Sequence, residues 1–138
     1  MLQRIQTLWL LLAGVFAFLT IRFAIYNGNK LVNAVNEYNI LNAGSNLFLL
    51  IATVALGLLS VIAIFLYKNR SMQLKICFAA LGVYVICCLL YFLEIKQFTQ
   101  GAFSLWAALF FLIPIFLLMA ARGIYKDIKL VKSIDRLR

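Results

Sequence analysis

The sequence predicts an all-α integral membrane protein, a bundle of four transmembrane helices followed by an amphipathic helix on the cytoplasmic side. Of the 138 residues, 66% are hydrophobic and only 12% are charged, compared with roughly 45–50% and 25% in soluble domains. Most of the apolar residues fall in four stretches, and a helix that crosses about 30 Å of hydrocarbon needs about 20 of them. The segments between these stretches are too short to fold alone, so residues 1–138 are expected to form a single membrane domain.

The first predicted span covers residues 7–26. Its unbroken apolar core, residues 8–21, ends at Arg22, whose charged end we expect to reach the headgroups so that the helix continues to Tyr26. A short core after a basic residue is also typical of a cleavable signal peptide. No small-x-small cleavage site follows this core, so we expect the segment to stay as a membrane anchor.

Residues 27–46 carry seven asparagines, which favour turns and helix caps over a long regular helix. Apolar residues nevertheless recur there at three- and four-residue steps. One interpretation is a short amphipathic helix on the outer membrane face, which would form a cap over a ligand. The other, which we favour, is a loop whose apolar residues pack on the ends of the bundle. These residues are Leu31, Ala34, Val35, Tyr38 and Leu41.

The second, third and fourth spans are predicted at residues 47–67, 76–93 and 102–121. Small residues allow close helix contact in membranes, and they occur on one stripe of the second span and in the inner half of the third. Pro114 lies midway along the fourth span, where a kink would open a cavity. The small residues are Thr53, Gly57 and Ser60 in the second span, and Ala79, Ala80 and Gly82 in the third.

The tail, residues 122–138, is predicted to form a basic amphipathic helix that turns near Gly123 and lies along the membrane surface. Anionic lipid there would favour its basic residues by about 1 kcal/mol each. Asp127 and Asp135 fall on the apolar side of this helix, where carboxylates need cationic partners. We expect one of them to pair with Arg4, and the other to meet a partner protein or a cation between the second and third spans, namely Lys68, Arg70 or Lys75.

Lys and Arg placement predicts the orientation, since these residues favour cytoplasmic loops. Ten of the 13 lie before the first span, between the second and third, or after the fourth. Both termini are therefore expected in the cytoplasm. Arg22 and Glu94 would both lie near the outer boundary, where an ion pair between them could join the first span to the third.

Residues that carry catalysis are scarce. The chain has no histidine, which removes the usual general base and the commonest metal ligand. Its three cysteines, Cys77, Cys87 and Cys88, all lie in the third span without the C-x-x-C spacing of redox centres. We therefore expect no enzyme activity, no catalytic residue, no cofactor, no metal site and no nucleic-acid partner.

The two ends of the chain resemble an uncharacterised family of small four-span bacterial inner-membrane proteins, known as domain of unknown function 4293. The resemblance rests on Met1, Gln3, Arg4, Ile5, Gln6, Thr7, Trp9 and Leu10, and on a closing run of residues. It implies a multi-pass protein of the bacterial inner membrane and no particular activity. The closing run is Ala121, Arg122, Ile124, Lys126, Asp127, Lys129, Leu130, Val131, Lys132, Ser133, Asp135, Arg136, Leu137 and Arg138.

Two classes of function remain. The first is a non-enzymatic accessory or scaffold protein of the membrane, whose end motifs contact a membrane protein partner, a second copy or each other. The second is a small transporter or lipid-binding protein that works as an oligomer and uses a cavity near Pro114. The first is preferred, because the chain has no acid within its first span for ion coupling.

Overall fold

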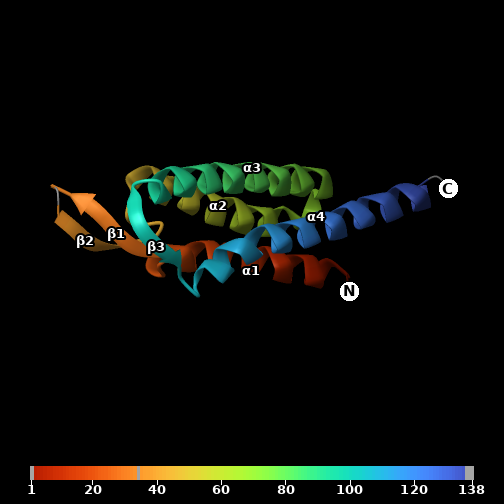
Figure 1. Ribbon diagram of the computed structural model, residues 1–138. Coiled ribbons are helices and arrows are strands. Elements are labelled where there is room, and N and C mark those ends of the chain that lie inside the picture. Colours follow the sequence, from red (N-terminus) through yellow and green to blue (C-terminus); the bar gives the residue numbers. More distant parts are fainter. Residues whose placement is uncertain (1, 34, 136–138) are drawn as a thin grey trace.

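Four long helices run side by side in an elongated bundle with a small sheet at one end (Figure 1). The computed structural model describes residues 2–33 and 35–135, and it describes the side chains of all of these except residues 2–4, 32, 134 and 135. Four of the described helices are long and apolar enough to cross a membrane. The helices are α1 (Leu2–Arg22), α2 (Leu47–Phe65), α3 (Arg70–Ile95) and α4 (Ala107–Asp135), and a short 3-10 helix, η1 (Leu66–Lys68), joins α2 to α3.

The bundle closes as a ring in which α1 packs against α2 and α4, and α3 packs against the same two helices. The predicted small-residue stripe of α2 is confirmed as a packing face, because Thr53, Gly57 and Ser60 are all buried. At Gly57 the ring of Phe18 comes so close that an added Cβ would lie 2.7 Å from it. The corresponding prediction for α3 is confirmed at Ala80, which is buried, and wrong at Ala79 and Gly82, which are exposed. An added Cβ on Gly82 would have no atom within 4 Å.

The all-α prediction is wrong at one end of the molecule, where three antiparallel strands form a sheet in the order β2-β1-β3. Asn33 at the turn between the first two has a φ of 50°, a left-handed conformation that asparagine tolerates. In β1 an added Cβ on Gly28 would lie 2.3 Å from the carbonyl oxygen of Gln100 in β3, so this crossing requires glycine. The strands are β1 (Tyr26–Val32), β2 (Val35–Leu41) and β3 (Phe98–Phe103).

The sheet changes two predicted helix boundaries and replaces the predicted first loop. The first helix ends at Arg22 instead of continuing to Tyr26, where β1 begins. The fourth begins at Ala107 instead of 102, because residues 98–103 pair with β1. Between the first two helices, β1 and β2 pair as a hairpin instead of the expected loop or helix, and residues 42–46 connect it to α2. Among the apolar residues predicted to pack on the bundle, Leu41 is buried whereas three remain exposed. The exposed ones are Leu31, Val35 and Tyr38.

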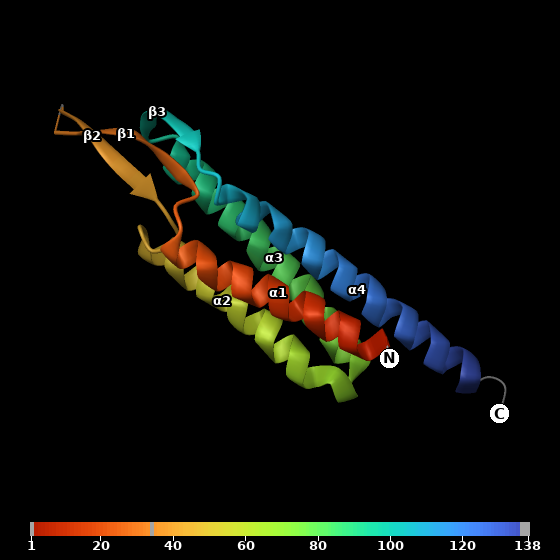
Figure 2. The same cartoon turned by 90° about the horizontal axis from the view of Figure 1, so that it is seen from below.

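The tail does not turn at Gly123. Helix α4 runs without interruption through that residue and continues beyond the rest of the bundle (Figures 1 and 2). Its 29 residues extend over about 43 Å at 1.5 Å per residue, which exceeds the hydrocarbon thickness of about 30 Å. A separate amphipathic helix lying flat on the membrane is therefore not what the described residues form.

The two ends of the bundle differ in charge. The end at which α1 begins and α4 ends, here called the basic end, also carries the connection between α2 and α3. The opposite end, here called the sheet end, carries the three strands. Basic side chains at the basic end are those of Lys68, Arg70, Lys75, Arg122, Lys126, Lys129 and Lys132.

Candidate docking site at the basic end

A buried hydrogen bond joins the two ends of the chain. The side-chain amide of Gln6 in α1 donates from Nε2 to Oδ2 of Asp127 in α4, at 2.8 Å and across 121 positions of sequence. Both side chains are buried, with exposed fractions of 5% and 7%. A hydrogen bond to a charged acceptor contributes about 1.5–3 kcal/mol. The bond therefore fixes α4 against the start of α1.

Gly123 provides the space for this bond. It precedes Asp127 by four residues, so the two lie on the same face of α4. An added Cβ at Gly123 would lie 2.7 Å from Cγ of Gln6 and 3.2 Å from its Nε2. The glycine that the sequence suggested as a turn thus serves as a site of close side-chain approach within a continuous helix.

Arg70, at the start of α3, links the connection between α2 and α3 to Asp127 in α4. Its Nη1 donates to the backbone carbonyl oxygen of Asp127 at 3.4 Å, a long and correspondingly weak hydrogen bond. Gln73, one turn later in α3, is buried and donates from Nε2 to the carbonyl oxygen of Ala63 in α2 at 2.9 Å. Side chains from three helices therefore close the basic end.

The groove beside this bond is here called the terminal groove, and it encloses about 220 Å³. Apolar side chains form much of its wall, and Ile5 and Leu130 are half exposed on either side of it. The ring of Trp9 is stacked on Phe116 at a centroid distance of 5.6 Å, which holds the indole in place. Its lining residues are Ile5, Gln6 and Trp9 from α1, and Met119, Gly123, Lys126, Asp127 and Leu130 from α4.

The sequence predicts that Arg4 pairs with one of the two tail acids, and among the described side chains Asp127 accepts from Gln6. The side chains of Arg4 and Asp135 lie outside those that the structure describes, so an ion pair of Arg4 with either Asp127 or Asp135 stays a prediction. Sequence reasoning placed Gln6 in a distinctive motif without giving it a role, and it missed Gly123 as a packing residue. The four-residue spacing of Gly123 and Asp127 was the available signal.

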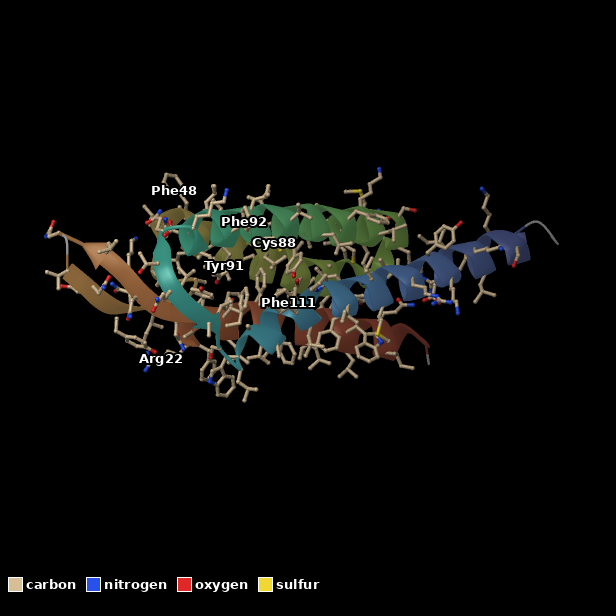
Figure 3. All side chains as sticks on the ribbon, viewed as in Figure 1. Arg22, Phe48, Cys88, Tyr91, Phe92 and Phe111 are labelled. Atoms are coloured by element: carbon tan, nitrogen blue, oxygen red, sulfur yellow. The ribbon has the colours of Figure 1, made fainter. Side chains whose placement is uncertain are left out.

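The proposed pair at the sheet end is not formed in the described part of the chain. Glu94 is half-buried at the end of α3 and accepts a hydrogen bond from the side-chain amide of Asn46. Arg22 is exposed and points away from α2 and α3 (Figure 3). Asn46 also caps α2 by accepting from the amide of Phe48 at 3.0 Å, as expected for an asparagine in this connection. Glu94 is therefore a positioning contact for the start of α2.

Side chains for metal or redox chemistry are not clustered. Among the described residues no group of three or more metal-ligating side chains occurs. Cys77, Cys87 and Cys88 are free thiols, and the first two are buried in the bundle. Cys88 is half-buried, near Tyr91 in the middle of the molecule (Figure 3). The described residues therefore offer side-chain contacts at the basic end as the best candidate for function.

Residues 2–137 match a family model described as "Domain of unknown function (DUF4293)". The match covers nearly the whole chain, including both segments that meet at the terminal groove. Neither the curated proteins nor the solved structures contain a match to this chain.

Proposed function

The chain belongs to the DUF4293 family, and we propose that it is a non-enzymatic accessory or scaffold protein of the bacterial inner membrane. In this proposal the basic end faces the cytoplasm, because ten of the 13 Lys and Arg residues lie on that side of the predicted spans. The terminal groove binds a membrane protein partner, and one apolar side chain of a partner helix fills it.

The proposal rests on the terminal groove. Residues from α1 form one wall and residues from α4 form the other, and the buried hydrogen bond between Gln6 and Asp127 holds the two walls in a fixed position. Ile5 and Leu130, at 51% and 52% exposure, leave apolar surface uncovered at the end of the bundle. A volume of about 220 Å³ accommodates a side chain but not a whole helix. Lys126 in the lining favours a partner that carries an acidic residue near the inserted side chain.

A matched pair of variants tests this function. Ile5→Ala with Leu130→Ala removes apolar surface from the groove. Leu8→Ala with Leu118→Ala is the control. It removes a comparable amount of apolar surface from α1 and α4 outside the groove, because these side chains are 52% and 54% exposed. Affinity-tagged protein is extracted in mild detergent, and the amount of copurifying protein per chain is measured.

We expect wild type and the Leu8/Leu118 variant to retain a stoichiometric partner and the Ile5/Leu130 variant to lose it at least tenfold. Equal retention by both variants would place the interface elsewhere. A wild-type protein that purifies alone with bound lipid or substrate would contradict the proposal and favour the transporter or lipid-binding class.

A further inference from the structure

A second cavity at the basic end lies on the other side of α4, between this helix and the connection from α2 to α3. It is open to the surface, has a volume of about 590 Å³ and is here called the basic cleft. The connection provides one wall and α4 the other. Its lining residues are Tyr67, Lys68, Asn69, Arg70, Ser71, Ile128, Val131 and Lys132.

The charged side chains described in the lining of the basic cleft are all positive. Lys68, Arg70 and Lys132 line it, and none of the lining residues that the structure describes is acidic. Arg70 is half-buried, and its Nη1 donates a hydrogen bond to the carbonyl oxygen of Asp127. A guanidinium has five N–H donors in a planar fork that suits phosphate oxygens. The cleft therefore presents positive charge with a partly fixed arginine, an arrangement that favours a phosphate group.

The remaining lining is apolar or amphipathic, which a site for a free phosphate would not need. Ile128 is half-buried and Val131 is 44% exposed on the α4 side, and Tyr67 lies on the other side. The cleft also lies at the ends of α2 and α3, where a membrane-spanning bundle meets the lipid headgroups. A ligand that brings both a phosphate and apolar chains to this depth is a phospholipid.

We propose that the basic cleft binds the headgroup phosphate of an anionic phospholipid. Arg70 contacts the phosphate oxygens, Lys68 and Lys132 add positive charge, and the apolar side chains contact the glycerol and upper acyl region. A zwitterionic phospholipid binds more weakly, because its own cationic group is repelled by the three basic side chains. This site goes beyond the partner proposed for the terminal groove and does not depend on it.

The test compares two triple variants of equal net charge. The first changes the cleft, by Lys68→Gln, Arg70→Gln and Lys132→Gln. The second changes basic residues of the same end that line neither the cleft nor the terminal groove, by Lys75→Gln, Arg122→Gln and Lys129→Gln. Full-length protein in detergent is titrated with phosphatidylglycerol, with phosphatidylcholine of the same chains and with glycerol 3-phosphate, and bound ligand is counted by native mass spectrometry.

We expect wild type to bind phosphatidylglycerol at least tenfold more tightly than either other ligand. The cleft variant should lose at least tenfold in affinity for phosphatidylglycerol, whereas the second variant should stay within twofold of wild type. Equal loss in both variants would show general charge attraction and overturn the site. Glycerol 3-phosphate binding as tightly as phosphatidylglycerol would overturn the lipid assignment.

A milder variant covers the case in which loss of Arg70 prevents folding. Lys68→Gln with Lys132→Gln leaves the contact of Arg70 with Asp127 in place and should weaken phosphatidylglycerol binding at least threefold without lowering Tm. Unchanged binding in this double variant would also contradict the proposal.

Discussion

Gly123 and Gln6 show how single atoms determine the join between α1 and α4. The amide of Gln6 reaches Asp127 only because position 123 has no Cβ. Gly123 lies in a helix, where glycine generally costs about 0.5–1 kcal/mol relative to alanine. The structure gives a reason for that cost here, since the side chain of Gln6 occupies the space.

Alanine substitutions at two helical glycines should therefore have opposite effects. Gly123→Ala forces Gln6 away from Asp127 and should lower stability by about 1–3 kcal/mol, the range for an unsatisfied buried polar group. Gly82→Ala meets no atom within 4 Å and should raise stability by up to about 1 kcal/mol. Thermal unfolding in detergent measures both. A stabilising Gly123→Ala would show that the close contact with Gln6 does not matter.

The bond between Gln6 and Asp127 also predicts a coupling energy. A double-mutant cycle with Gln6→Ala and Asp127→Ala should give non-additive effects of about 0.5–3 kcal/mol on stability. The parallel cycle with Arg4→Ala and Asp127→Ala tests whether Arg4 contributes as well. Additivity in the Gln6 cycle would mean that the hydrogen bond does not stabilise the packing of α1 on α4.

Among the secondary-structure elements, the hairpin of β1 and β2 is one that hydrophobic spacing did not predict. The three- and four-residue spacing of Leu31, Val35 and Tyr38 is typical of a helical face, yet these residues belong to strands. Leu31 and Tyr38 lie on one face of the sheet and Val35 on the other, as the pairing of Asn29 with Tyr38 and of Leu31 with Asn36 shows. Asparagines occur on both faces, which conceals the two-residue alternation of a strand.

Cysteine pairs distinguish the hairpin from a helix. In a background with Cys77, Cys87 and Cys88 changed to Ala, Asn29→Cys with Tyr38→Cys should form a disulfide under mild oxidation. Directly opposed residues lie about 4.5–5.5 Å apart, which suits a disulfide. In a helix the same positions would be about 13 Å apart along the axis.

Asn29→Cys with Asn36→Cys is the control, since these positions are diagonal neighbours at about 7–8 Å. Mobility in non-reducing gels measures the result. Equal oxidation of the two pairs would contradict the register of β1 and β2. Normal protein levels in the cysteine-free background would also agree with the expectation that the three thiols are dispensable.

The whole molecule is polarised along its long axis. The strands project from one end, while the start of α1 and the last turns of α4 lie at the other (Figure 1). Lys and Arg are concentrated at the end without strands. Lys and Arg favour the cytoplasmic side of a membrane protein. The orientation predicted from them therefore places the entire sheet outside the cytoplasm.

Labelling from one side of the membrane tests this orientation. In the cysteine-free background, Asn36→Cys in the hairpin should react with an impermeant thiol reagent added outside intact cells. Ser133→Cys in α4 should react only after the cells are opened. Both side chains are exposed, so access within the protein does not limit either reaction. The reverse pattern would overturn the orientation and move the basic cleft to the other leaflet.

The sequence by itself determined the four apolar helices, because the free energy of placing a helix in hydrocarbon is a sum over neighbouring residues. It also indicated that the two terminal motifs matter, and that the asparagines of residues 27–46 suit turns and helix caps. Only the tertiary structure decided the pairing of β1 with β3, the continuation of α4 through Gly123 and the contact of Gln6 with Asp127. These features depend on contacts between residues distant in sequence, up to 121 positions for Gln6 and Asp127. Local propensity and hydrophobic spacing contain no information about which distant side chain fills the space beside Gly123.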